Sequence, residues 1–178
     1  DPETGEYNVS YVKRFCGPGR WALVNLTYRE QGFIVRKGNP KGIRDIRDLK
    51  RPDVSFVNRQ KGAGTRLLLD IKLREAGISP EEVRGYSREE YTHMAVAAAV
   101  ACGVADVGLG ILAAASALGL DFIPIDQERY DLALPAEFME TGHWEKLYAV
   151  ITSEEYRAAV ERLGGYDLRD TGRVVWRS

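Results

Sequence analysis

The sequence predicts an α/β fold built around an open, mostly parallel sheet. Between residues 54 and 125, short apolar runs of strand length alternate with segments whose apolar residues recur at helical spacing. Such alternation is typical of parallel strands joined by crossover helices. The 178 residues, of which 44% are hydrophobic, suffice for one large domain or two small lobes.

The region before residue 54 predicts turns followed by β-structure. Residues 1–20 are rich in turn-forming residues, with a short helix or strand expected around Val9–Phe15. Trp21–Leu26 and Gln31–Val35 are rich in β-branched and aromatic residues, and we predict a strand over each. Residues 37–49 predict a loop and a short helical turn.

The remaining elements have ordinary lengths, and the tail from residue 166 gives little periodic signal. Strands are predicted over residues 54–57, 83–86, 105–110, 122–125 and 130–135. Helices are predicted over residues 67–77, 94–103, 111–118, 141–152 and 153–164. Several of these helices end at glycine, which is a common helix stop.

The loop over Asn58–Arg66 joins the first of these strands to its helix and has the features of an anion site. Its two glycines, Gly62 and Gly64, let the backbone approach a ligand closely because they carry no Cβ. Thr65 is expected to cap the helix, with its hydroxyl beside the free amides of the first turn, which attract negative charge. Three basic residues share the loop: Arg59, Lys61 and Arg66. The alternative is a glycine-rich turn that caps a helix and binds nothing.

A second helix start and a third loop have similar features. Ligands of open α/β sheets collect beyond the carboxyl ends of the strands, where helices begin. Thr92 is expected to cap the alanine-rich helix beside His93, and Gly108 and Gly110 again permit close backbone approach. The ligand-contacting candidates are therefore Arg59, Lys61, Gly62, Ala63, Gly64, Thr65, Thr92, His93, Gly108 and Gly110.

The sequence shows no pattern typical of a catalytic or metal site. His93 and His143 lie far apart, and no spacing of Cys, His or carboxylates resembles a metal cage. A Walker loop, a complete dinucleotide-binding fingerprint and a Gly-x-Ser-x-Gly elbow are all absent. We therefore expect a non-enzymatic domain without a cofactor, in which His93 is structural or lines a ligand site.

Charge and hydropathy set the expected partners. The formal net charge of −1 gives no global field to recruit nucleic acid, so this segment is not expected to bind it directly. No apolar stretch approaches the length of a membrane span, and no signal-peptide pattern opens the chain. We expect a cytoplasmic location, although a segment upstream of Asp1 could carry such a signal. Cys16 and Cys102 do not form a disulfide framework.

Five short stretches carry a family resemblance, and the match runs over nearly the whole chain, to about Tyr166 and Asp167. They are Pro2–Asn8, Arg29–Gly32, Gly38–Gly42, Phe56–Arg66, and Thr92–His93 with Ala95–Val100. These stretches resemble the periplasmic-binding-protein-like domain found at the C-terminus of some molybdopterin biosynthesis proteins and behind helix-turn-helix segments of regulators. The Asn-Arg-Gln-x-Gly-x-Gly-Thr-Arg motif is the most specific of them.

The resemblance implies a type II periplasmic-binding-protein fold, with two α/β lobes of mostly parallel sheets and a ligand cleft between them. It places the chain crossings near Ile34–Lys37 and Tyr130–Leu134. Residues 1–36 and 131–178 are accordingly assigned to lobe 1, and residues 37–130 to lobe 2, which carries the anion-binding helix starts. Family members begin with a further strand–helix–strand segment, so lobe 1 is expected to be truncated at its N-terminus.

The resemblance also implies a ligand, since relatives bind molybdate or tungstate through neutral hydroxyls and amides. By this analogy Gly62–Thr65 and Thr92–His93 line the cleft, as do Gly108–Gly110 more loosely. The leading hypothesis is a small-oxyanion binding module linked to molybdenum cofactor biosynthesis or molybdate sensing. The alternative is an effector-sensing domain of a LysR-like or other regulator that binds an organic anion. Either function implies fusion to an upstream molybdopterin-biosynthesis or DNA-binding domain.

Overall fold

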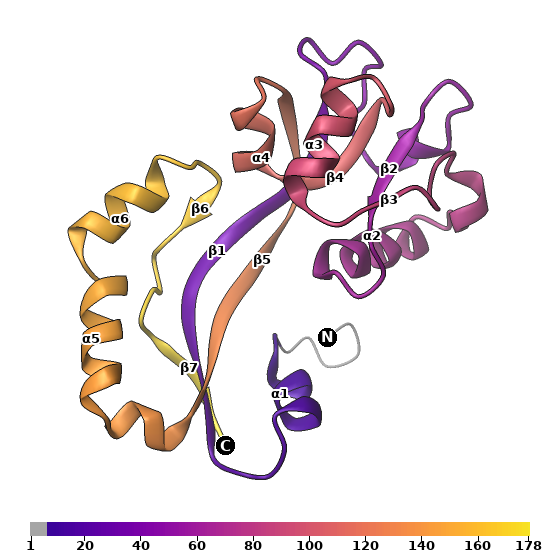
Figure 1. Cartoon of the computed structure of the whole chain (residues 1–178). Helices are drawn as coiled ribbons and strands as arrows, with labels where there is room; N and C mark the ends of the chain where they lie inside the picture. Colours follow the sequence, from indigo (N-terminus) through magenta and orange to yellow (C-terminus); the bar gives the residue numbers. More distant parts are fainter. Residues whose placement is uncertain (1–6) are drawn as a thin grey trace. The chain divides into compact units, whose positions relative to one another are not determined.

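The computed structural model of the chain describes residues 7–178 (Figure 1). The chain folds into two compact units. Unit 1 consists of Asp1–Arg29 and Gln127–Ser178, and unit 2 of Glu30–Asp126. The boundaries expected from the sequence, after residues 36 and 130, lie a few residues farther along the chain. Most of the Pro2–Asn8 stretch lies outside the described residues.

Two long neighbouring strands, β1 (Trp21–Val35) and β5 (Asp121–Pro135), each contribute residues to both units (Figure 1). The sequence predicted two separate strands within each of these ranges, and the breaks between them are wrong. In β1 the strand continues because Tyr28 and Arg29 pair with β6 (Tyr166–Asp167). Sheet pairing with a distant segment therefore overrides the local polar composition.

The sheet of unit 2 is mixed, and the expectation of a mostly parallel sheet is corrected accordingly. Strand β2 (Phe56–Arg59) runs parallel to β3 (Glu89–Glu90) and to β4 (Val107–Ile111), whereas β1 pairs antiparallel with β4. Strands β1 and β2 lie on either side of β4 and run antiparallel to each other, and a connection between antiparallel strands needs no crossover helix. The segment between β1 and β2 accordingly holds only a short 3-10 helix, η1 (Ile46–Lys50).

Helices cover both faces of this sheet, and the alternation of side chains along the strands explains why. Phe33 and Phe56 pack with Leu69 of α2 (Gly64–Glu75) in one buried cluster. Ile34 and Val57, the next residues along their strands, pack instead against a second set of helices. Those helices are α3 (His93–Ala101) and α4 (Leu112–Ala117). Successive strand residues point to opposite faces, so the same two strands supply both cores.

The strand predicted near residues 83–86 lies instead at β3, and the reason is local. Val83 is buried in the core, and Gly85 has φ +97° in a position where a Cβ would overlap the carbonyl oxygen of Phe56. This segment therefore follows β2 as a loop, and parallel pairing begins only at Asn58 opposite Glu89. A 3-10 turn, η2 (Pro80–Glu82), precedes it.

Unit 1 is built on the other half of β1, which pairs antiparallel with β6 and with β7 (Val174–Arg177). The strands β6 and β7 come from the tail that showed little periodicity. Val9 and Val12 of α1 (Val9–Phe15) pack on Leu23 of β1. The remaining helical segments of unit 1 are η3 (Ala136–Glu140), α5 (Gly142–Ile151) and α6 (Glu154–Glu161). Within residues 7–178, no helix is long and apolar enough to cross a bilayer.

Candidate functional site

The start of α2 presents backbone amides that have no hydrogen-bond acceptor among the described residues 7–178. The amides of Arg66 and Leu67 donate to the carbonyl oxygen of Ala63, which is the N-cap residue. No acceptor among residues 7–178 takes the amides of Gly64 and Thr65, which as first-turn groups have no intrahelical partner. Because the cap is an alanine, no side-chain oxygen covers them. The expectation that Thr65 caps this helix is therefore wrong.

Thr65 is the second residue of α2, and its side chain has a different partner. Its hydroxyl donates to Oε1 of Gln31 in β1 over 3.2 Å. Both residues are buried, with Thr65 4% and Gln31 0% exposed. Nε2 of Gln31 is also buried and has no hydrogen-bond partner among residues 7–178. A buried polar side chain with an unused donor therefore stands beside the open amides of α2.

Gln31 was not among the residues that the sequence singled out. Strand alternation could have found it, because Gln31 lies two residues before Phe33 and so shares its buried face. A glutamine at a core-facing strand position is unusual enough to examine. In the sheet it lies opposite Ile111, at the carboxyl end of β4.

The start of α3 follows the neighbouring strand β3. As predicted, Thr92 is the N-cap, and its hydroxyl oxygen accepts a hydrogen bond from the amide of Ala95 at 3.0 Å. Arg59 of β2 pairs with Glu90 of β3, and its guanidinium donates to the carbonyl oxygen of Tyr91 at 3.1 Å. The loops that lead into α2 and α3 are therefore adjacent at the carboxyl end of these parallel strands.

The arginines of the motif are engaged within the protein. Arg66 pairs with Glu89 at 2.9 Å and with Asp70 at 3.2 Å, and its guanidinium lies 4.1 Å from the ring centre of Tyr86. Burial lowers the pKa of Arg66, but hydrogen bonding to Tyr86 and the charge of Asp70 outweigh burial and raise it overall. Arg66 is thus a permanent cation with local counter-charges. Lys61, by contrast, is exposed.

The glycines differ in what they do. Gly62 has φ +89°, a conformation that favours glycine, and this turns the chain into α2. A Cβ on Gly108 would overlap Val96 of α3, and one on Gly110 would lie 2.7 Å from Ile34 Cδ1 and 3.4 Å from His93 Nδ1. Gly108 and Gly110 are buried and permit close packing of α3 on the sheet. The structure thus joins Gln31 to the start of α2, and it gives Gly108 and Gly110 a packing role.

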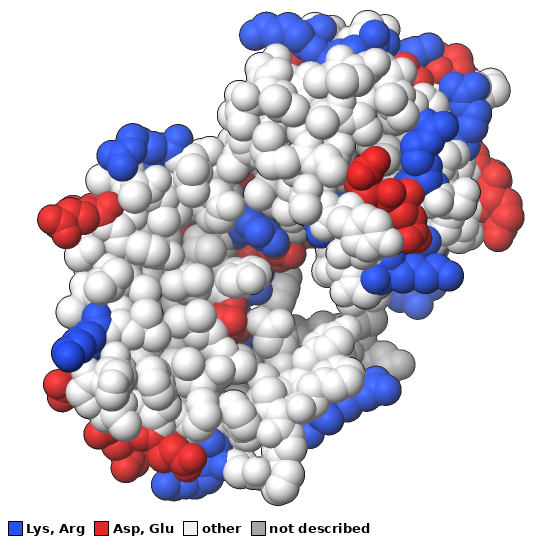
Figure 2. Space-filling model, viewed as in Figure 1, with Lys and Arg blue, Asp and Glu red and all other residues white. Residues whose placement is uncertain are grey.

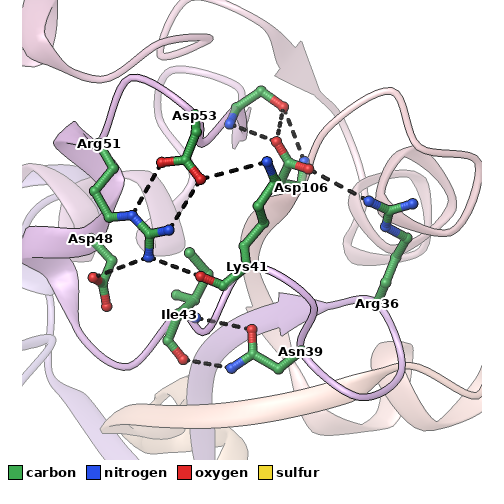
Figure 3. A network of polar contacts seen from close by, with 9 residues as sticks. Arg36, Asn39, Lys41, Ile43, Asp48, Arg51, Asp53 and Asp106 are labelled. Atoms are coloured by element: carbon green, nitrogen blue, oxygen red, sulfur yellow. Dashed lines mark hydrogen bonds and ion pairs between the residues drawn. The ribbon is translucent and has the colours of Figure 1, made fainter.

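A second polar network lies around the amino ends of β2 and β4, at Asp106 and the loop before β2 (Figure 3). The Asp106 carboxylate accepts from the Ser55 amide at 2.9 Å and from the Ser55 hydroxyl at 2.7 Å, and it lies 3.6 Å from Arg36. Arg51 forms two hydrogen bonds to Asp53. Each charge in this network faces an opposite charge, so the network anchors the loop and offers no unbalanced charge to a ligand.

Charged residues are also interspersed on the surface. On the face shown in Figure 2, Lys and Arg alternate with Asp and Glu and do not gather into one field. Among residues 7–178 there is no group of three or more His, Cys, Asp or Glu placed to hold a metal ion, and Cys16 and Cys102 are free thiols.

Sequence comparison gives one family and two relatives. The family described as the PBP superfamily domain matches residues 1–152. The "Uncharacterized protein YvgK" of Bacillus subtilis (strain 168) is 39% identical over 175 residues, which are 98% of this chain and 56% of that protein. The "Uncharacterized protein in ferredoxin 2Fe-2S gene 5'region" of Clostridium pasteurianum is 41% identical over 114 residues, which are 61% of this chain and 97% of that protein. The chain thus spans little more than half the length of YvgK.

Solved structures share the fold at low sequence identity. The H2O2-bound form of an OxyR cysteine-to-serine mutant from Corynebacterium glutamicum is similar with a TM-score of 0.60 and 15% identity, over 83% of this chain and 48% of that one. L-phospholactate-bound PEB3 is similar with a TM-score of 0.56 and 16% identity, over 82% of this chain and 68% of that one. The ancestral amino-acid-binding protein AncCDT-1 is similar with a TM-score of 0.52 and 18% identity, over 79% of this chain and 59% of that one.

Proposed function

The chain belongs to the family of PBP superfamily domains and is a ligand-binding domain of the periplasmic-binding-protein type, and from this premise we propose that its ligand is a small oxyanion of the molybdate or tungstate type. The proposed site is the start of α2. One observation carries the proposal: the Thr65 hydroxyl joins Gln31 to the open first turn of α2, and among residues 7–178 neither the amides of Gly64 and Thr65 nor the buried Nε2 of Gln31 has an acceptor. Oriented N–H groups at a helix start favour negative charge.

Three donors support weak binding, which approaches the micromolar range only with the largest hydrogen-bond energies. A hydrogen bond to a charged group contributes about 1.5–3 kcal/mol, so the three donors together contribute about 4.5–9 kcal/mol. Micromolar binding corresponds to roughly 8 kcal/mol, and association itself costs several kcal/mol. Every donor therefore matters, and the helix dipole of α2 adds about 0.3–2 kcal/mol more.

The character of the donors favours an oxyanion over a carboxylate with a charged tail. The three donors are neutral, and the charge of Arg66 is already balanced by Asp70 and Glu89. Because the donors themselves carry no charge, selection depends on the geometry and number of acceptor oxygens. A tetrahedral dianion presents four of them. Proteins of this type bind ligands without chemical conversion, and we expect the same of this domain.

Gly64 allows a direct test of the proposed site, because its backbone N–H donor can be removed by a single substitution. Proline suits the first position of a helix, and Ala63, with φ −73° and ψ 139°, has the extended conformation that a residue before proline requires. Gly64→Pro therefore deletes one N–H donor from a folded helix. Gly64→Ala is the matched control, since it adds a Cβ but keeps the N–H.

The measurement is calorimetric titration with tungstate, molybdate, sulfate and phosphate at one ionic strength. We expect the proline variant to bind tungstate about ten- to hundredfold more weakly than the alanine variant, which is the loss of one hydrogen bond to a charged group. Equal affinities of the two variants, with both folded, would show that the anion does not contact the start of α2.

A second candidate function is effector sensing with an organic anion. The supporting observation is that the match covers 98% of this chain but only 56% of YvgK. YvgK therefore has a further region, and binding of an effector to the matched domain could change the state of that region. A domain that signals in this way must bind its effector differently in two states. L-phospholactate, an organic anion that PEB3 binds, therefore belongs in the titration panel. Binding of L-phospholactate, together with no binding of tungstate, would favour this function over the first.

A further inference from the structure

We propose that Gln31 is the specificity-determining residue of the α2 site, in which its carboxamide fixes the Thr65 hydroxyl and offers one neutral, buried N–H donor to an unprotonated oxygen of the anion. This inference rests on the proposed function, because it concerns the same site. It adds a residue from β1 that lies outside the glycine-rich motif, and it states which protonation state of an oxyanion the site prefers.

The orientation of the Gln31 side chain is set by one hydrogen bond. Oε1 accepts from the hydroxyl of Thr65, and the two residues are 34 positions apart in the sequence. Because Oε1 and Nε2 share one carbon atom, fixing the first also fixes the second. Nε2 then lies within a few ångströms of the Thr65 hydroxyl and has no partner among residues 7–178.

An unused donor at this position is unfavourable for folding alone. Gln31 is completely buried, and a buried N–H without an acceptor carries its full desolvation penalty. An apolar side chain of similar size would pack beside Phe33 without this cost. Local violations of folding rules of this kind are expected at binding sites, where a ligand supplies the missing partner.

The direction of the Thr65–Gln31 hydrogen bond decides the ligand. With Thr65 as the donor, Gln31 presents only N–H groups, which suit fully ionised oxygens such as those of tungstate, molybdate and sulfate. In the reverse arrangement Nε2 would donate to Thr65 and Oε1 would be the unused atom. A bare Oε1 would favour a protonated oxyanion such as hydrogen phosphate. The structure has the first arrangement.

Two substitutions separate the roles of the two amide atoms. Gln31→Met keeps the length of the side chain and removes both polar atoms. Gln31→Glu keeps the shape and the acceptor for Thr65, but it replaces the N–H donor with a negatively charged oxygen. Gln127→Met is the control, because Gln127 lies in unit 1 and its Oε1 accepts from Arg169 at 3.2 Å. Thermal unfolding and calorimetric titration with tungstate, sulfate and phosphate are measured for each variant.

We expect Gln31→Met to bind tungstate about ten- to hundredfold more weakly. Its ligand-free melting temperature should change little, because removal of the unpaired Nε2 offsets the loss of the acceptor for the Thr65 hydroxyl. Gln31→Glu loses more affinity than Gln31→Met, because like charges repel. In Gln31→Glu, tungstate and sulfate lose more affinity than phosphate, since only phosphate can donate a proton to the new carboxylate. A purely structural glutamine would lower the melting temperature and leave the affinities unchanged.

The outcomes distinguish this inference from the proposed function. If the wild-type protein binds none of the anions, the proposed function fails and the role of Gln31 fails with it. If the wild-type protein binds tungstate and Gly64→Pro weakens it, but Gln31→Met binds within twofold of wild type, only the role of Gln31 is overturned. That role is also overturned if phosphate binds the wild-type protein more tightly than tungstate, or if tungstate, sulfate and phosphate all lose the same affinity in Gln31→Glu.

Discussion

Replacing Arg66 by methionine tests whether the charge of the motif serves the fold or the ligand. The side chain of Arg66 is only 7% exposed, and it pairs with Glu89 and Asp70, which are 30% and 41% exposed. It also donates to the carbonyl oxygen of Arg59 at 3.2 Å. Methionine keeps the apolar contact with Tyr86 but removes every one of these polar interactions.

The expected cost follows from the exposure of the partners. Breaking a fully buried ion pair costs about 3–5 kcal/mol. Glu89 and Asp70 can regain water, so Arg66→Met should cost less than this. A charged hydrogen bond of about 1.5–3 kcal/mol and a cation–π contact of about 0.5–2 kcal/mol set the scale, and we expect a loss of about 2–4 kcal/mol. Anion affinity of the folded variant should stay within about twofold.

The assay is urea unfolding followed by far-ultraviolet circular dichroism. Tryptophan fluorescence is unsuitable because Trp21, Trp144 and Trp176 all belong to unit 1, whereas Arg66 lies in unit 2. Lys61→Met is the matched comparison, since Lys61 is an exposed cation of the same loop and its removal should change stability by less than about 0.5 kcal/mol. A stability loss no larger than that of Lys61→Met, or a tenfold weaker affinity of the folded Arg66→Met protein, would refute the structural role of Arg66.

Two further predictions concern packing and pH. Gly108→Ala should destabilise by about 1–3 kcal/mol in thermal unfolding, because its Cβ overlaps Val96, whereas Gly142→Ala, where a Cβ meets nothing within 4 Å, should not destabilise; equal melting temperatures would contradict the overlap. Burial raises the pKa of Asp106, but hydrogen bonds from Ser55 outweigh it and hold that pKa below its ordinary value of 3.8. The ionised Asp106 carboxylate therefore stabilises the fold fully at pH values above 3.8. This stabilisation is lost as the pH falls below 3.8 and through the lowered pKa of the folded state. Asp106→Asn should be less stable than wild type by up to about 1.5–3 kcal/mol at pH 7 in urea unfolding, and the difference should shrink below about pH 4; a difference independent of pH would count against an ionised carboxylate.

The elements of unit 2 were largely predictable, because their signals are local. The alternation of β2, α2, α3 and β4 was evident from apolar periodicity, and the Thr92 cap of α3 is confirmed. The continuity of β1 and β5 was not predictable in this way. Residues 27–30 and 126–129 are polar and resemble loops, and only pairing with distant strands holds them extended.

The position of helix α2 was predictable from the sequence, but the contacts of its first turn were not. The motif correctly marked the start of α2, yet the cap is Ala63, because Thr65 already lies inside the helix and its hydroxyl is engaged by Gln31. No local rule connects Thr65 to a residue 34 positions away. The same limit applies to Arg66, whose counter-charges come from within α2 and from β3. Sequence motifs identify the chemistry available, whereas tertiary contacts decide which part of it remains free.

The geometry of a helix explains how the first turn of α2 can be held in place by its side chains and still keep free backbone amides. Successive helical residues point about 100° apart, so Thr65 and Arg66 leave the helix in different directions. Thr65 reaches β1 through Gln31, and Arg66 reaches the end of β2 and Glu89 of β3. The turn is therefore held from two sides by side chains, while Gly64 places no side chain over the third. The amides are left open because they belong to the first turn and the cap, Ala63, has no side-chain acceptor, whereas Thr65 and Arg66 hold the helix in place. The anion site that we propose would therefore be rigid without using the motif's arginines to bind the anion.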